Sequence, residues 1–141
     1  MARKRKPQPK GEEEIHKFTE WLQHLANASR DRIVLVQHKS DADILSSLQI
    51  KNVYFYTKPE FGLLSKIIES GKECILIFDV NKNSNKLAER IKSELQQRGV
   101  KVNTRFRKIL FTSKFKELSG ILTYLHEQVA ETPRKHASVN F

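Results

Sequence analysis

The chain has 141 residues, with 26 Lys and Arg against 16 Asp and Glu, and a formal charge of +10 at neutral pH. This length suits one domain that is stable without covalent staples, and the single cysteine, Cys74, excludes an intrachain disulfide. Its apolar runs fall far short of the ~20 residues that span a bilayer, and acidic residues follow the basic N-terminus, so we expect a cytoplasmic protein with no membrane partner.

The first ten residues hold five basic side chains and no acid, and they account for half of the net charge. A basic tail on a basic body predicts a polyanionic partner, RNA or DNA, although a merely solubilising surface is the simpler alternative. We expect residues 1–11 to be disordered, because they are basic, contain proline and lack apolar periodicity. Within this tail we assign nucleic-acid contacts to Arg3, Lys4, Arg5 and Lys6.

The next segment, residues 12–30, predicts an amphipathic N-terminal helix, because Ile15, Phe18 and Leu22 recur at spacings of three and four. Residues 31–130 then alternate strands with helices. Apolar or alternating runs predict four strands, at residues 32–37, 52–56, 74–79 and 101–107. Helical periodicity and capping signals predict helices at residues 40–48, 57–71, 85–98 and 120–129. Gly99 is expected in the left-handed conformation, and residues 131–141 are expected to form a flexible tail.

Strands joined by helices predict an α/β fold with a four-stranded, mostly parallel, Rossmann-like sheet flanked by helices, plus the extra N-terminal helix. Such sheets bind ligands beyond the carboxyl ends of their strands, where the winding direction reverses. In this chain those ends are residues 37–39 after the first strand and residues 79–84 after the third. We therefore expect the functional chemistry at these two segments.

Both segments carry a recognisable pattern. Val36-Gln37-His38-Lys39-Ser40-Asp41 resembles the first Toprim motif, a strand that ends in Glu-Gly-Lys with an Asp two residues later. Ile75-Leu76-Ile77-Phe78-Asp79-Val80-Asn81, before a long helix, resembles the second, an Asp-x-Asp at a strand end. The resemblance covers residues 31–129 and is closest to small stand-alone archaeal and bacterial Toprim proteins. It implies that the sheet is a Toprim-like version of the Rossmann-like fold.

The resemblance also assigns roles to three acidic positions. In Toprim enzymes the Glu is a general acid or base and the two aspartates hold Mg²⁺. In this chain Gln37 stands at the Glu position and Asn81 at the second Asp, so Asp79 is the one acid of the three that remains. Glutamine has no titratable proton, and the formal charge offered to the ion falls from −3 to −1. We expect no required cofactor and only weak, substrate-dependent Mg²⁺ binding at Asp79, with phosphate oxygens supplying further ligands.

Each of these residues also has a simpler structural interpretation. Asp79 either faces a phosphate or metal, or caps the helix that follows its strand. Asp41 and Asp43 are better explained as acids of a first helical turn than as ligands. His38 is better explained as a polar loop residue than as a proton shuttle. The turn at residues 81–85 either presents amide and N–H groups to a phosphate or is ordinary capping.

A second basic cluster surrounds the fourth strand. Arg105 and Arg107 alternate with apolar residues there, which predicts that both lie on its exposed face. Three phenylalanines, Phe106, Phe111 and Phe115, alternate with the basic residues of this cluster. We expect at least two of them to pack in the core rather than stack on nucleobases. Outside the tail, the residues assigned to nucleic-acid binding are Lys39, Lys82, Arg105, Arg107, Lys108 and Lys114.

These observations favour a nucleic-acid-binding Toprim-like module without catalytic turnover, which contacts the phosphate backbone through its tail and basic surface. Two alternatives remain open. One is a divergent Mg²⁺-dependent nuclease or phosphotransfer enzyme of the Toprim type that uses Asp79. The other is an adaptor whose basic tail docks it on a ribonucleoprotein assembly. A metal-dependent cleavage assay separates the first from the preferred function, and comparison of naked RNA with a purified assembly separates the second.

Overall fold

The computed structural model describes residues 7–128, and it confirms an α/β fold with a four-stranded, all-parallel sheet flanked by helices. The strand order is β2-β1-β3-β4, consistent with a Rossmann-like fold. The strands are β1 (Ile33–Val36), β2 (Val53–Phe55), β3 (Cys74–Ile77) and β4 (Val102–Asn103). Within the described chain no helix is both long enough and apolar enough to cross a membrane.

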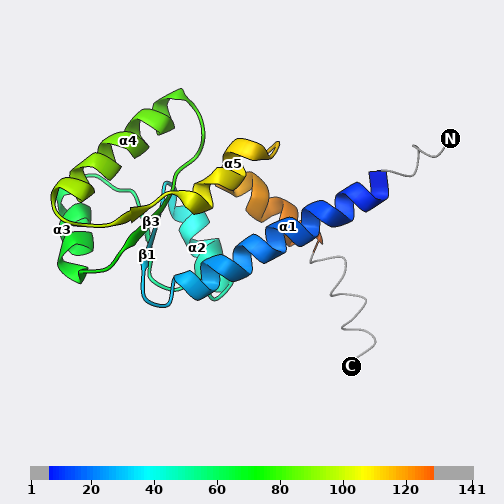
Figure 1. Ribbon diagram of the computed structural model, residues 1–141, viewed down its shortest axis with the longest axis horizontal. Coiled ribbons are helices and arrows are strands. Elements are labelled where there is room, and N and C mark those ends of the chain that lie inside the picture. The colour runs from blue at the N-terminus through cyan, green and yellow to red at the C-terminus, as the bar shows by residue number, and fades with distance from the viewer. Residues whose placement is uncertain (1–6, 129–141) are drawn as a thin grey trace.

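Strands β1 and β3 form the centre of the sheet and are buried at every position. Helices α3 (Glu60–Ser70) and α4 (Lys82–Gln97) cover one face. The other face carries α1 (Pro7–Ala28), α2 (Lys39–Ser47), α5 (Lys108–Thr112) and a last helix that spans residues 118–128 (Figure 1). Because side chains alternate along a strand, Val34 and Ile75 join the core on this second face, whereas Leu35 and Leu76 join the core under α3 and α4.

Helix α1 docks through its apolar stripe, as the sequence predicts. The ring of Phe18 is almost fully buried and lies edge-on to Phe115 and Tyr124, with both pairs of ring centroids 5.7 Å apart. The helix begins at Pro7, however, and not at residue 12. Residues 7–11, where the sequence predicts a disordered tail, are assigned to α1, and proline is well suited to a first helical turn, where its missing N–H has no acceptor to lose. The predicted contacts at Arg3, Lys4, Arg5 and Lys6, and the tail at 131–141, lie outside the described residues.

The fourth strand departs most from the sequence-based prediction. Strand β4 ends at Asn103, and Arg105–Arg107 form a turn of 3₁₀ helix that leads into α5, a helix the sequence did not predict. Arg105 is exposed as expected, but Arg107 is only 7% exposed, so its placement on an exposed strand face is wrong. The reason is a set of hydrogen bonds from its guanidinium to the end of β3, which pull this side chain inward.

Two helix starts also shift from their predicted positions. The residue that precedes α2 is His38 rather than Ser40, and no side chain caps that helix. Helix α4 begins at Lys82 instead of residue 85, because the side chain of Asn81 accepts a hydrogen bond from the Ser84 N–H at 2.8 Å and caps it. The predicted left-handed conformation of Gly99 is confirmed, with φ of +88°.

Two glycines offer a matched test of this backbone geometry. An added methyl group would meet no atom within 4 Å at either Gly99 or Gly62, which lies inside α3. Of these two glycines, only Gly99 has a positive φ. We predict that Gly99→Ala lowers the free energy of unfolding by about 1 kcal/mol, whereas Gly62→Ala raises it by about 0.5 kcal/mol. Urea unfolding of both variants checks this, and changes of the same sign would contradict it.

Candidate functional site

The winding of the sheet reverses between β1 and β3. The chain runs from β1 outward to β2, then crosses over β1 to reach β3 and continues outward to β4. All four strands are parallel, so the carboxyl ends of β1 and β3 meet at one edge of the sheet. This is the point at which open α/β sheets bind their ligands. Gln37 lies there directly after β1, and Asp79 is the second residue after β3.

The structure brings Gln37, His38 and Asp79 into direct contact. The Gln37 Oε1 atom accepts a hydrogen bond from the Asp79 backbone N–H at 3.1 Å. His38 Nε2 lies 3.0 Å from Asp79 Oδ2, and the Leu118 N–H donates to Asp79 Oδ1 at 3.0 Å. The nearly buried Asp79 carboxylate therefore joins the end of β3 to the starts of α2 and of the last helix. It does not cap α4, which is the role of Asn81.

Asp41 lies in the first turn of α2, as the sequence predicts, but its environment is unusual. Its side chain is 1% exposed, and neither carboxylate oxygen has a hydrogen-bond partner among the described residues. Burial raises the pKa of Asp41 from 3.8 to about 6, the negative charges of Asp79 and Glu117 add to this rise, and His38 opposes it. Buried acids without partners are costly, and groups with perturbed pKa values concentrate at functional sites. We call Gln37, His38, Asp41 and Asp79 the switch-point cluster.

The buried Arg107 side chain holds the backbone on which Asp79 of this cluster lies. Its Nε donates to the Phe78 carbonyl oxygen at 2.6 Å, and its Nη2 donates to the Asp79 carbonyl oxygen at 2.5 Å and to Asn85 Oδ1 at 2.7 Å. Burial lowers the pKa of the Arg107 guanidinium. Because its donors bind backbone and side-chain oxygens inside the protein, Arg107 positions the end of β3. Because these donors are already used, Arg107 is not a candidate for phosphate contact.

Asn81 is not brought into the cluster. It is exposed, and its amide oxygen is occupied in capping α4. The sequence therefore places Gln37 and Asp79 together correctly, whereas Asp41 takes the position beside Asp79 that the resemblance led us to expect for Asn81. The signal for Asp41 was present in its spacing within the first motif, but its burial depends on the packing of α2 against the sheet, which the spacing does not reveal.

The carboxylates that could contact a magnesium ion in this cluster are those of Asp41 and Asp79. Both carboxylate oxygens of Asp79 already accept or face a hydrogen-bond partner. Among the side chains that the structure describes, those of residues 13–128, no three of His, Cys, Asp or Glu are grouped so that they could hold a metal ion. Mg²⁺ requires near-octahedral oxygen ligands and loses its water reluctantly. Of the two neighbouring carboxylates, that of Asp41 keeps both oxygens without a hydrogen-bond partner in the described chain, so weak, substrate-dependent Mg²⁺ binding at Asp79 stays a prediction.

Exposed lysines lie around the same edge of the sheet. Residues 104–116 contain five basic residues and no acid, and this segment is fixed to the loop after β3 by a 2.7 Å hydrogen bond from the Val80 N–H to the Lys116 carbonyl oxygen. Lys82 begins α4, directly after that loop. Lys39 pairs with Asp43 at 3.0 Å. Among the lysines that the sequence assigned to binding, Lys82, Lys108 and Lys114 are exposed and pair with no carboxylate in the part of the chain described, and we call these three the carboxyl-edge lysines.

The interleaved phenylalanines divide as expected. Phe106 and Phe115 pack against the core, whereas Phe111 is 49% exposed. The Arg107 guanidinium lies 5.0 Å from the centre of the Phe111 ring. Phe111 is therefore the one phenylalanine of the three whose ring is largely exposed.

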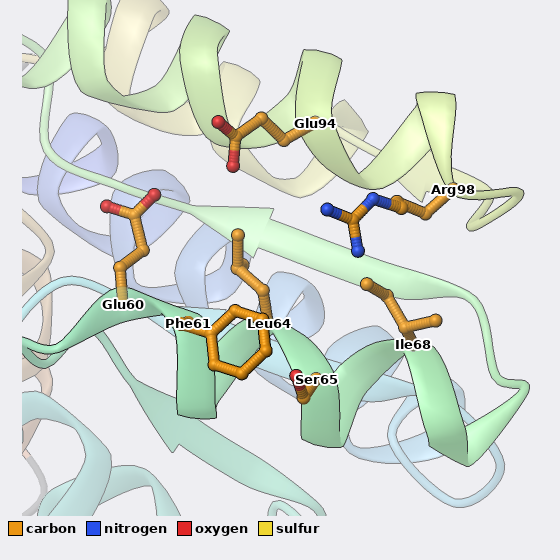
Figure 2. A pocket seen from close by; sticks show the side chains of 7 residues that line it. All are labelled: Glu60, Phe61, Leu64, Ser65, Ile68, Glu94 and Arg98. Atoms are coloured by element: carbon orange, nitrogen blue, oxygen red, sulfur yellow. The ribbon is translucent and has the colours of Figure 1, made fainter.

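A separate hollow of about 200 Å³ lies between α3 and α4, on the opposite face of the sheet from α1. Figure 2 shows Glu94 and Arg98 on α4 and its end, facing Phe61, Leu64 and Ile68 on α3. Glu60 at its rim is held by Arg90 through bonds of 2.6 and 2.9 Å, and that pairing lowers the pKa of Glu60. The hollow contains none of the residues that the sequence assigned to function.

Comparisons with known proteins agree with the fold. No protein-family model matches the chain. A UPF0292 protein of Methanocaldococcus jannaschii is 23% identical over 124 residues, which cover 84% of this chain and 97% of that protein. A solved structure of a protein from Aquifex aeolicus aligns with a TM-score of 0.65 and 29% identity, over 71% of this chain and 94% of that one. The chain is thus similar to both over nearly their whole lengths, and neither protein's name states an activity.

The burial of Arg107 leads to a stability prediction. Arg107→Ala removes three hydrogen bonds and leaves the carbonyl groups of Phe78 and Asp79 without these donors. We expect the free energy of unfolding to fall by about 3 kcal/mol. The matched variant Arg105→Ala removes an exposed arginine two residues away and should change it by less than about 0.5 kcal/mol. Equal losses in urea unfolding would show that Arg107 does not hold the end of β3.

The unpartnered Asp41 leads to a prediction about pH. Because the folded-state pKa of Asp41 is raised from 3.8 to about 6, the folded protein binds a proton in this window that the unfolded chain has released. The free energy of unfolding should therefore fall as the pH rises from about 4 to about 6, with the full penalty present above that range. Asp41→Asn removes this titration, so its stability relative to the wild type should rise by about 2 kcal/mol between pH 4 and pH 7.

Asp43→Asn is the control for this measurement, because Asp43 is exposed in the same helix and pairs with Lys39. Its effect should stay within about 0.5 kcal/mol at both pH values. The experiment is urea unfolding of the three proteins at each pH. A wild-type–Asp41→Asn difference that does not depend on pH would contradict the raised pKa.

Proposed function

We propose that this protein is a Toprim-like nucleic-acid-binding module that works without catalytic turnover. The observation that carries the proposal is the acid-free basic segment, residues 104–116, which is hydrogen-bonded to the loop after β3 at the point where the winding reverses. Lysines without carboxylate partners at such an edge attract phosphate groups. RNA and DNA share this backbone chemistry, so the proposal covers both.

Two side-chain amides support the absence of catalytic turnover, because each makes a structural hydrogen bond. The Gln37 side chain has no titratable proton and accepts a hydrogen bond from the Asp79 N–H. The Asn81 side chain caps α4. Both positions at which the Toprim resemblance leads us to expect catalytic acids thus have structural tasks in this protein. These tasks support a fold retained for binding after the catalytic chemistry was lost.

One observation favours the rival proposal of a phosphotransfer enzyme or nuclease. The unpartnered Asp41 carboxyl, with its pKa raised to about 6, has the proton affinity of a general acid or base. The site nevertheless lacks the grouped ligands that would hold a metal ion beside it. The rival is tested by incubating labelled RNA and DNA with the protein and Mg²⁺ or Mn²⁺, where cleavage that disappears in Asp41→Asn and Asp79→Asn would establish it.

The binding proposal predicts a steep dependence on salt. Each phosphate contact made by a lysine contributes about 0.7–0.9 to the slope of the logarithm of affinity against the logarithm of salt concentration. Replacing the carboxyl-edge lysines, Lys82, Lys108 and Lys114, together by Gln should weaken binding of a labelled RNA and make this slope shallower by about 2. Fluorescence anisotropy at several salt concentrations measures both quantities.

A matched triple variant controls for charge alone. Lys51, Lys66 and Lys72 are also exposed and pair with no carboxylate among the side chains of residues 13–128, but they lie on α3 or at the amino ends of β2 and β3. Their replacement by Gln should change the salt slope by less than half as much. Equal effects of the two triple variants would show that net charge and not this edge drives binding. Binding only to a purified ribonucleoprotein, and not to naked RNA or DNA, would favour the adaptor.

A further inference from the structure

A second candidate site lies away from the switch-point cluster, between the C-terminal half of α1 and the segment that follows β4. It is an open groove of about 560 Å³ that shares no residue with the cluster. This volume is within the range of sites that bind small molecules. The groove contains no acidic residue, and its lining consists of Trp21, His24, Asn27, Ala28, Arg32, Asn103, Arg105 and Phe106.

Two aromatic side chains form a fixed wall of the groove. The Trp21 indole N–H donates to the Phe106 carbonyl oxygen at 2.9 Å. The two rings lie edge to face, with centroids 6.4 Å apart and planes at 66°. Both side chains are half-buried, so each keeps part of its surface open to solvent. Rigid aromatic rings of this kind provide stacking surfaces for planar ligands at little entropic cost.

The positive charge of the groove comes mainly from Arg105. Arg32 is shared between Asp31 at 3.0 Å and Glu73 at 3.2 Å, which neutralise it. Arg105 is exposed and pairs with no carboxylate in the described part of the chain. Its backbone is fixed by a 2.9 Å hydrogen bond from its N–H to Asn103 Oδ1. A guanidinium on a fixed backbone, beside an aromatic wall, matches an anion attached to a planar ring.

We propose that this groove binds one unpaired nucleotide of a single-stranded nucleic acid, with the base against Trp21 and Phe106 and a neighbouring phosphate on Arg105. This inference rests on the proposed function, because it gives that function a preference for single strands. A base inside a duplex is stacked on its neighbours and cannot reach a protein ring, whereas an unpaired base can. Base stacking depends little on sequence, so the groove recognises strandedness and not a particular base.

The chain offers a direct probe of this groove, because Trp21 is its only tryptophan. The probe ligands are a single-stranded RNA of about ten nucleotides, a duplex of the same length, and an abasic strand with the same phosphates but no bases. Anisotropy of a label on each strand reports all binding, and Trp21 fluorescence reports contact at the groove. We expect the RNA to quench Trp21 at saturation, and the duplex and abasic strand to bind with far less quenching.

A pair of arginine variants separates the groove from general charge. Arg105→Ala should weaken binding of the single-stranded RNA about fivefold and make the salt slope shallower by about 0.7. Arg98→Ala should change affinity less than twofold, because Arg98 lies over the hollow between α3 and α4 (Figure 2). Anisotropy and thermal melting of both variants give the affinities and confirm that both remain folded.

The outcomes distinguish this proposal from the one on which it rests. Quenching by the RNA that exceeds quenching by the abasic strand and is reduced in Arg105→Ala supports the groove. Binding of the RNA without quenching of Trp21, equal quenching by the abasic strand, or equal effects of the two arginine variants overturns the groove and leaves the proposed function standing. No binding of any strand at low salt overturns both proposals.

Discussion

The hydrogen bonds from the buried Arg107 guanidinium to the end of β3 are the constraint on which the functional end of this fold depends. They hold the Phe78 and Asp79 carbonyl groups and reach Asn85 in α4. They thereby connect the segment after β4 to the end of β3 and to the first turn of α4. The side chain of the same Asp79 contacts His38 and the first residue of the last helix.

The sequence predicts the sheet well because its central strands are buried on both faces, and burial of that kind appears as short continuous apolar runs. The two chain segments at the reversal of winding could likewise be predicted, since the ends of β1 and β3 follow directly from those runs. The burial of Arg107 could not be predicted in this way. An alternation of polar and apolar residues fits an exposed strand as well as a turn of 3₁₀ helix, and the carbonyl groups that bind Arg107 lie 28 and 29 residues away along the chain.

The pKa of Asp41 is a second property that could not be predicted from the sequence. Its position in a first helical turn is readable from spacing, but its pKa depends on desolvation and on the charges of Asp79 and Glu117, which come from other elements. A buried acid without a hydrogen bond opposes folding at neutral pH. Residues that break the local rules in this way tend to be retained for function, and the cluster at the winding reversal is where such an exception is expected.

The two surfaces proposed to bind nucleic acid depend on different physical forces. The carboxyl-edge lysines attract phosphates on any strand, and that attraction weakens as salt rises. The groove at Trp21 and Phe106 relies on stacking, which salt affects far less. At low salt the charged edge should dominate and the protein should bind duplex and single strand alike. At higher salt the stacking contribution should remain, so preference for single strands should grow with salt even as total affinity declines.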